Sequence, residues 1–492
     1  MNYYRKSKFI ALLTMVLVLL ITGSGLTKEI SLKEAIDWGL KHNHSLDEIE
    51  YELNQTELEL AKIKTKLGWQ MRLSVVPSYR VETETVSTLI DLGGKFAIVP
   101  TTEQERTKNK ELIMKLEGSK KFTSGLELKQ NLVLNETDTF NFNNLDDKTN
   151  LKIGFNQDIY PQLPIPIEQK EHSIYNNLVK IKEKLNWERR SKKIEWLANY
   201  LNLLRLQQKL KIVKENYQLA KDDWEQVLIE KKINEADRIQ VLMAKVNLKK
   251  AKFKLNQVKN ELNQQYDSWL QKLSLSKDKQ VVFSEQSFYL QQIREFINEA
   301  QINLDNKVGL VEEAVVNNWQ LKANRLDQKL VFKQKKWRQL EDKPQIEFGG
   351  NYASSSEDWL LQMSLTYDLF DGGQQNLLVK DYQKQAVKLD HDYRNLIESL
   401  RLEINRLIDQ LKQAQLNLEE KELALEKAEL EKEISKEQLK QGLINEKEFT
   451  KKEILFKQAE VDLKVAQDNI LLSQLRLVHF LGLDKRLDGE RG

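Results

Sequence analysis

The sequence contains no cysteine at all. This absence excludes disulfide bonds, thiolate metal sites and lipid attachment to an N-terminal cysteine of a mature chain. Proline is scarce, with six among 492 residues, and aromatic residues make up only 8%, whereas charged residues account for 31%. This composition is typical of long solvated helices rather than of one compact core of this size.

The one long hydrophobic run lies at the N-terminus. Phe9–Ile21 is a mostly apolar run of thirteen residues that follows the basic residues Arg5, Lys6 and Lys8 and precedes the small residues TGSGLT. The run is short for a membrane span, so residues 1–27 are predicted to be a cleaved signal peptide. A retained N-terminal anchor is the alternative. Either way, the protein is expected to be exported.

Charge of one sign is not in excess. Three of the 77 basic residues belong to the signal, which holds no acidic residue, so the rest of the chain balances 74 basic against 74 acidic residues. Nucleic-acid-binding proteins need a basic surplus on one face. We therefore expect no nucleic-acid partner.

What the sequence does contain is an internal duplication. A strand-patterned block leads into a helix of about 65 residues, then a short polar break and another helix, and this order occurs twice. The segment GLKHNHSL (39–46) matches AVVNNWQL (314–321) at a constant offset of 275. The pattern predicts a first repeat over 28–294, a second repeat over 295–483 and a polar tail over 484–492.

Both repeats are expected to contain the same elements. The first repeat should hold a helix over 31–68, interrupted at 42–45, strands over 70–160, a long helix over 168–232 and a helix over 236–273. The second should hold a helix over 311–340, strands over 344–370, a long helix over 374–441 and a helix over 446–483. The stretches 84–110 and 135–149, rich in Thr, Asn, Asp and Gly, are predicted to be loops between strands.

The predicted strands alternate between apolar and polar residues. Leu73, Val75 and Tyr79 alternate with Arg72, Ser74 and Ser78, and Trp359, Leu361, Met363, Leu365, Tyr367 and Leu369 alternate with polar residues in the same way. Such strands suit the wall of a membrane barrel with a wet lumen, and Trp69, Tyr160, Trp359 and Tyr367 would suit its interfacial aromatic girdle. The alternative is an ordinary sheet whose apolar face packs on the long helices. A barrel would require several chains, because even eight strands enclose a space filled by side chains.

The long helices carry apolar residues at spacings of three and four, a coiled-coil pattern with breaks in register. Their charge-dense faces, such as residues 419–440, indicate either a solvated coiled-coil exterior or a tube of helices in an aqueous compartment. Polar breaks interrupt this pattern at KKINEADR (231–238) and QGLINEKEF (441–449).

These segments resemble the TolC-type outer-membrane efflux family. The resemblance rests on LKEAIDWGLKHNHSL near the N-terminus, SLTYDLFDGG before a long helix, QGLINEKEF at a helix break and AEVDLKVAQDNILLSQLRLVHFLGL at the end. It covers the whole mature chain. It implies an α+β, mostly α, duplicated fold, with long coiled-coil helices forming an α-barrel and short antiparallel strands contributing to a trimeric transmembrane β-barrel.

The resemblance also implies partners and a role. The chain would form a homotrimer in the lipid of the outer membrane, with its helices in the periplasm, and would dock with a periplasmic adaptor protein and an inner-membrane transporter. It would act as a passive exit duct for efflux or secretion. The two helix breaks would be the periplasmic tips, which form the entrance and the docking site.

Among the residues expected at the tips, Asp237 and Glu448 match the acidic entrance positions of the family. The full set consists of acidic residues and a turn glycine. They are Glu235 and Asp237 in the first break, and Gly442, Glu446 and Glu448 in the second. The alternative is that Asp237 and Glu448 merely stabilise helix N-termini. Two features depart from the family pattern: Lys451 stands where a second acidic residue is often found, and an extra strand pair occurs near 112–134.

No pattern of catalytic or metal-binding residues is present. His42 and His44 are two positions apart and do not share a helix face, and DGG at 371–373 lacks the Lys-Ser/Thr of a phosphate-binding loop. We expect no enzyme activity and no cofactor. The rival interpretations are an exported coiled-coil adaptor or scaffold without a pore, and a cell-wall enzyme with a coiled-coil spacer.

Overall fold

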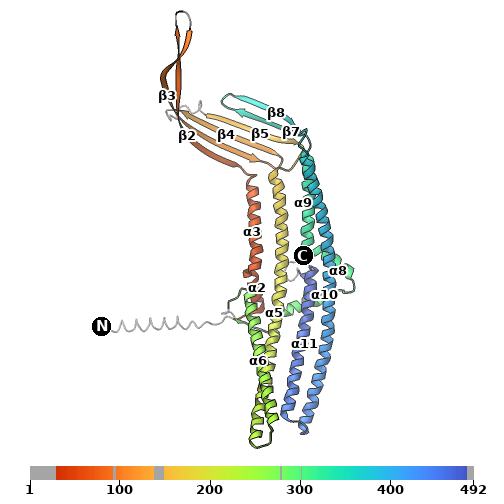
Figure 1. Ribbon diagram of the computed structural model, residues 1–492. Helices are drawn as coiled ribbons and strands as arrows, with labels where there is room; N and C mark the ends of the chain where they lie inside the picture. The colour runs from red at the N-terminus through yellow and green to blue at the C-terminus, as the bar shows by residue number, and fades with distance from the viewer. Residues whose placement is uncertain are drawn as a thin grey trace, which may run out of the picture. The chain divides into compact units, whose positions relative to one another are not determined.

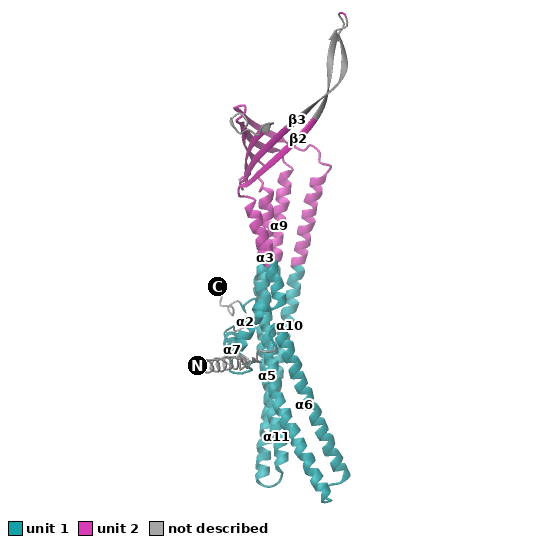
Figure 2. Cartoon of the chain, turned by 90° about the vertical axis from the view of Figure 1, so that its left-hand side faces the viewer, with its two compact units in different colours: residues 1–52, 181–322, 394–492 teal, residues 53–180, 323–393 magenta. Residues whose placement is uncertain are grey.

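The computed structural model describes residues 29–91, 93, 96–137, 149–276, 280–300 and 302–484. The predicted signal peptide, and the tail beyond Asp484, lie outside these residues. The predicted fold class is confirmed, because the described chain is mostly helical with one six-stranded antiparallel sheet. It divides into two units: unit 1 holds residues 1–52, 181–322 and 394–492, and unit 2 holds residues 53–180 and 323–393 (Figure 2).

The sheet lies wholly within unit 2 (Figure 1). Its strands are β2 Gln70–Asp91, β3 Phe96–Lys121, β4 Leu126–Thr137, β5 Thr149–Tyr160, β7 Gln345–Ala353 and β8 Asp358–Thr366. They lie in the order β2-β3-β4-β5-β7-β8, and every neighbouring pair is antiparallel. The first repeat thus contributes four strands and the second contributes two.

Three strand boundaries differ from those expected. The loop predicted over 84–110 is wrong, because β2 continues to Asp91 and β3 begins at Phe96, paired from Thr85↔Gln104 to Asp91↔Phe96 with one register shift. The turn-forming residues in this segment predicted a loop, but backbone pairing between the two strands of a hairpin makes most of it strand instead. The loop predicted over 135–149 is shorter at both ends, with residues 138–148 outside the described residues. The last strand ends at Thr366 rather than at residue 370.

Four helices belong partly to unit 2. They are α3 His44–Thr65, α5 Pro166–Lys232, α9 Trp319–Glu341 and α10 Gln374–Lys440. Polar contacts within unit 2 join them pairwise: Lys170 pairs with Glu59 of α3 at 3.3 Å, Lys180 donates to Asp327 of α9 at 2.8 Å, and Asn324 donates to the Leu389 carbonyl of α10 at 3.2 Å. The helix order α3, α5, α9, α10 therefore follows the order of the strands β2, β5, β7 and β8, to which these helices connect.

Unit 1 contains the remaining helices and a two-stranded parallel sheet. The helices are α2 Leu32–His42, α6 Arg238–Lys272, α7 Phe288–Ala300, α8 Lys307–Asn317 and α11 Glu446–Phe480, and the strands are β1 Glu29–Ile30 and β6 Gln280–Val281. Its core is aromatic. Trp196 and Tyr200 of α5 are fully buried against Trp269 of α6, whose indole N–H donates to the Trp196 carbonyl at 3.1 Å. Gly39 of α2 packs closely against this core: a Cβ added at this position would lie only 2.6 Å from the Leu273 side chain.

Two asparagines break the predicted helices at equivalent points of the duplication. The interruption expected at 42–45 is confirmed, because Asn43 separates α2 from α3, whereas the helix expected over 311–340 begins at Lys307 and is divided at Asn318 into α8 and α9. These residues differ by the same offset of 275 that the sequence shows. The side-chain oxygen of Asn318 accepts hydrogen bonds from the backbone amides of Gln320 and Leu321. The side-chain amide of Asn43 donates to the backbone carbonyl of Lys272.

A buried ionic network joins α5, α11 and the segment before α7. The Arg205 guanidinium donates to both Asp468 oxygens at 2.7 and 3.2 Å and also pairs with Glu285, which accepts from Gln208 and pairs with Lys464 at 3.1 Å. Burial alone would raise the pKa of Glu285, but the hydrogen bonds from Gln208, Arg205 and Lys464 lower it to about 2 from an ordinary 4.5. Ionised Glu285 is therefore stabilised by folding.

This network predicts an acid-sensitive contribution to stability. Because the folded pKa is depressed, the contribution of Glu285 is complete above about pH 4.5 and is lost as the pH falls towards about 2. The melting temperature of the wild type should therefore exceed that of Glu285→Gln at neutral pH, and this difference should shrink across that window. Thermal scans of the detergent-solubilised full chain at stepped pH measure it. Glu295→Gln, an exposed residue of α7, is the control, and an equal difference at every pH would contradict the assignment.

Candidate functional site

One face of the unit 2 sheet is apolar across all six strands. Directly opposite residues of antiparallel strands share a face, so the register identifies the members of each row. One row consists of Leu73, Leu116, Leu132 and Leu151 on β2 to β5, and another consists of Ile153, Tyr352 and Trp359 on β5 to β8. The alternation predicted from sequence is thus in register from strand to strand.

The opposite face is polar in the same way. Its rows include Arg72, Glu117, Asn131 and Lys152 on β2 to β5, and Asn156, Gly349 and Gln362 on β5 to β8. Charges of both signs lie next to one another on this face, as in the pairs of Glu127 with Lys121 and Lys129 at 3.4 and 3.3 Å. Such a face is suited to contact with water.

The apolar face is not covered by the described helices. Every residue of β8 is exposed, with Trp359, Met363 and Leu365 at 75%, 72% and 70%, and Leu73 of β2 is 68% exposed. This observation contradicts the alternative in which the sheet packs its apolar face on the long helices. Exposed apolar area of this extent is costly in water and marks a lipid or protein contact.

The lengths of four strands and the placement of aromatic residues fit a bilayer, whereas β2 and β3, with 22 and 26 residues, are longer. The strands β4, β5, β7 and β8 have 12, 12, 9 and 9 residues, close to the roughly 9–11 residues of a membrane-spanning strand. Trp69, Tyr160 and Tyr367 lie at the ends of β2, β5 and β8 that adjoin the helices, whereas Trp359 lies at the opposite end, 4.7 Å from the Tyr352 ring. Their role as two interfacial girdles stays a prediction.

The first helix break contains Glu235 and Asp237, both exposed. Asp237 is the N-cap of α6: its carboxylate accepts from the Gln240 amide at 2.7 Å, and the Gln240 side chain accepts from the Asp237 amide at 2.8 Å. Asn234 has a φ of 63°, which allows the Glu235 amide to reach the Glu230 carbonyl. Asp237 therefore caps a helix, whether or not it also acts at an entrance.

The second break contains Gly442, Glu446 and Glu448, also exposed. Gly442 has a φ of 73°, a conformation that favours glycine. The N-cap of α11 is Asn445, which accepts from the Glu448 amide at 2.9 Å, while Glu446 and Glu448 occupy the first helical turn. Sequence reasoning did not single out Asn445, although an asparagine before a helical pattern is a standard N-cap signal.

Ion pairs hold the helices beside these breaks. Lys447 pairs with Asp223 of α5, Lys457 with Glu215 of α5 at 2.9 Å, and Lys452 with Glu431 of α10 at 2.9 Å. Figures 1 and 2 both place the two breaks at the same end of unit 1. The structure thus brings the two predicted tips to one end, with α11 fastened to α5 there.

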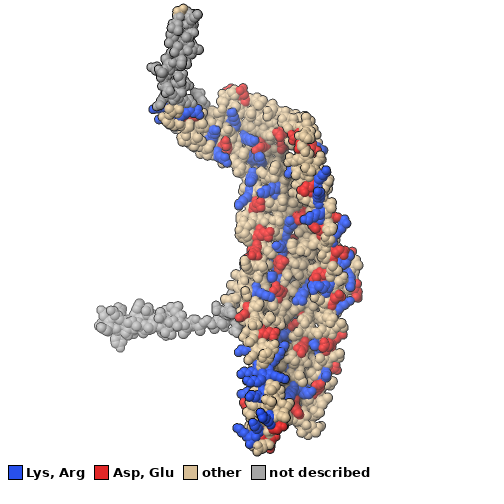
Figure 3. Space-filling view, viewed as in Figure 1, with Lys and Arg blue, Asp and Glu red and all other residues tan. Residues whose placement is uncertain are grey.

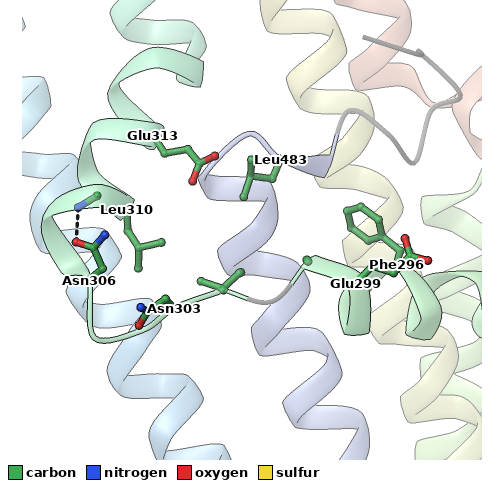
Figure 4. Close-up of a pocket in the computed structure, with 10 residues that line it drawn as sticks. Phe296, Glu299, Asn303, Asn306, Leu310, Glu313 and Leu483 are labelled. Carbon is green, nitrogen blue, oxygen red and sulfur yellow. Dashed lines mark hydrogen bonds between the residues drawn. The ribbon is translucent and has the colours of Figure 1, made fainter.

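The remaining histidine and cavity candidates show no catalytic arrangement. His42 stacks on Trp38 with ring centroids 4.0 Å apart, and His44 lies 3.7 Å from Glu48. Within the described residues no three His, Cys, Asp or Glu side chains are grouped as metal ligands. A hollow of about 440 Å³ lies at the connection between α7 and α8, and its lining residues Glu299 and Glu313 come from different helices (Figure 4). The sequence patterns gave no indication of it.

No described helix is long and apolar enough to cross a membrane. Comparison with protein families gives a match over residues 310–483 to the family described as outer membrane efflux protein. This match confirms the resemblance stated from the sequence and covers most of the second repeat. No curated protein matches the chain by sequence.

Solved structures resemble nearly the whole chain in fold. The CmeC outer membrane channel of Campylobacter jejuni is 13% identical with a TM-score of 0.59, over 92% of this chain and 85% of that one. The outer membrane protein VceC of Vibrio cholerae is 14% identical with a TM-score of 0.56, over 92% and 96%. The open state of the MtrE outer membrane channel of Neisseria gonorrhoeae is 11% identical with a TM-score of 0.57, over 92% and 88%. The matched family and these structures are membrane proteins rather than enzymes, in agreement with the expectation of no catalysis.

Substitutions of Asp237 can distinguish its role as a helix cap from the effect of its negative charge. Asn caps a helix about as well as Asp, whereas Ala at an N-cap costs about 1 kcal/mol. Asp237→Ala should therefore speed amide exchange in the first turn of α6, and Asp237→Asn should leave it near the wild-type rate. Hydrogen-exchange mass spectrometry measures both, with Asn445→Ala as the parallel change at α11. Equal acceleration by Asp237→Asn and Asp237→Ala would show that charge, not capping, is what Asp237 contributes.

Proposed function

We propose that this chain is one subunit of a trimeric outer-membrane channel, the passive exit duct of an efflux or secretion system. The observation that carries the proposal is the sheet of unit 2. Apolar residues of neighbouring strands lie opposite one another on one exposed face of this sheet, and the other face is polar. In a closed wall the apolar face contacts lipid and the polar face lines water. The match to the outer membrane efflux protein family supports this assignment.

The assembly into a trimer is supported by an exposed seam on α10. Leu402, Leu416, Leu423 and Leu430 differ by seven or a multiple of seven, and each is more than half exposed. Exposed leucines at multiples of seven on a long helix are typical of a coiled-coil seam that lacks its partner helix, although Asp409 interrupts this series. A second copy of the chain supplies that partner.

Helix α6 has the complementary character. It exposes Ile239, Leu242, Met243 and Phe253, and it carries eight basic against two acidic residues. Figure 3 shows Lys and Arg side chains gathered over this part of unit 1. The end of α10 over 419–440 has the opposite balance, with eight Glu against five Lys. Packing α6 of one copy against α10 of the next buries both apolar stripes and brings opposite charges together.

The tips form the periplasmic entrance and the docking site for a periplasmic adaptor protein that connects to an inner-membrane transporter. Export is driven by that transporter, so the duct itself requires no cofactor. Asp237 and Glu448 contribute negative charge at the entrance, and opening changes the packing of the helices beside the breaks. The rival interpretation, an adaptor or scaffold without a pore, leaves the exposed apolar face of the sheet without a partner.

Conduction tests the proposed function directly. The detergent-purified chain should insert into planar bilayers as discrete, trimer-sized channels that favour cations. Asp237→Asn and Glu448→Gln should reduce the cation preference because each removes one negative charge per subunit while keeping a similar shape. Glu261→Gln, an exposed change on α6 away from the tip, is the control. A monomer that stays soluble without detergent and forms no channels would contradict the proposal.

The seam on α10 gives an independent prediction for assembly. Leu→Ala at a buried contact costs about 2–5 kcal/mol, so Leu423→Ala with Leu430→Ala should lower the temperature at which the trimer dissociates. Heated, mildly denaturing gels of the detergent-solubilised protein measure that temperature. The matched control is Glu422→Ala with Glu429→Ala, at the preceding positions of the same helix. An equal loss in both double variants would argue against a seam at the leucines.

A further inference from the structure

The sheet of unit 2 is open, with β2 and β8 as its edges. Both edges are bare: β8 is exposed throughout, and residues 70–81 of β2 are exposed except at Ser74, whereas the inner strands are mostly half-buried. Hydrocarbon offers no hydrogen-bond partner, so open sheet edges do not occur within a membrane. Six strands are also too few to close on themselves around water.

The duplication within the chain supplies a template for closing this gap. The pair β5–β7 joins the last strand of the first repeat to the first strand of the second, and its register runs from Lys152↔Ala353 to Tyr160↔Ile346. Here a strand that leads into a long helix, α5, pairs with a strand that follows a shorter helix, α9. The two edges have the same character, because β8 leads into α10 and β2 follows α3.

Strand direction agrees with this equivalence. Every neighbouring pair in the sheet is antiparallel, so with six strands the two edges run in opposite directions. A copy related by rotation therefore presents β2 antiparallel to β8. The alternation of side chains also allows this pairing. The exposed apolar residues have odd numbers on both edges, Met71, Leu73 and Val75 on β2 and Leu361, Met363 and Leu365 on β8, so one register can place all of them on the same face.

We infer that β8 of one subunit pairs with the first nine residues of β2 of the next, and that three copies of the six-stranded sheet close one wall of eighteen strands. The inference rests on the proposed trimer. Matching the helix-adjacent ends places Gln70 opposite Thr366, which puts Ser74 opposite Gln362 on the lumen side. The extra strand pair that the sequence contains is thereby part of the wall.

The strand number sets the width of the duct. With strands about 4.8 Å apart and tilted by about 40°, a wall of this size has a backbone radius of about 18 Å. Barrels of 16–18 strands enclose an aqueous channel, whereas eight strands enclose only side chains. The polar rows that contain Lys152 and Gln362 would line this lumen.

Cysteine pairs test the seam without background, because the natural chain has no cysteine. The full-length Ser74→Cys, Gln362→Cys variant, treated in outer membranes with a short thiol-to-thiol crosslinker, should yield covalent dimers and trimers on denaturing gels. The pair Ser74→Cys with Leu361→Cys places the second thiol on the other face of the sheet and should crosslink much less than the first pair. The control for reactivity is Lys152→Cys with Ala353→Cys, which lie opposite each other within one chain. Its crosslink joins two strands of the same chain, so the band should stay at the mass of a monomer.

The outcomes separate the seam from the trimer. Native mass spectrometry of the same variants reports whether three chains associate. A trimer in which Ser74→Cys, Gln362→Cys fails to crosslink overturns the inference and leaves the trimeric channel intact. So does a trimer in which Asn131→Cys on β4 crosslinks to Gln362→Cys instead, since the β2–β3 hairpin would then stand outside the wall. Absence of any trimer would contradict the proposed function itself.

Discussion

The constraint on which this structure depends is that every backbone amide and carbonyl of a sheet needs a hydrogen-bond partner. The strands β2 to β8 supply partners for one another, but β2 and β8 each leave one side unpaired. Water can pair such groups at the surface of a soluble protein, and hydrocarbon cannot. Because the exposed apolar face of this sheet, with Leu73, Trp359 and Leu365, suits lipid, we propose that other copies of the same sheet complete its open edges.

Because of the duplication, both halves of the chain have the same order of helices and strands. Asn43 and Asn318 break the entry helices at equivalent points, and Asp237 and Asn445 cap the return helices after the two breaks. In unit 1 the Arg205–Asp468 pair joins the two repeats by fixing α5 against α11, whereas the aromatic core around Trp196 fixes α5 against α6 within the first repeat. We propose that the exposed leucines of α10 and the basic face of α6 contact other copies of the chain.

Periodicity in the sequence predicts most of this fold, because long apolar patterns such as those of α5 and α10 leave few alternatives. It fails where tertiary pairing overrides local pattern: the ends of β2 and β3 that were predicted to be a loop are strands because they pair with each other in a hairpin, from Thr85↔Gln104 to Asp91↔Phe96. The candidate tips lie at breaks that the sequence locates, but their capping geometry depends on Asn445, which local pattern did not single out. The Arg205, Glu285 and Asp468 network joins residues up to 263 positions apart, so no local pattern contains it.

The central claim, that the open sheet is completed by neighbouring copies within lipid, is tested most directly by amide exchange at its edges. Residue-resolved hydrogen exchange of the full chain in lipid nanodiscs reports whether each amide of β8 has a partner. The account predicts that consecutive amides from Asp358 to Thr366 are protected to the same degree as those of the inner strand β4. Rapid exchange at every second residue of β8, the signature of an unpaired antiparallel edge, would contradict it.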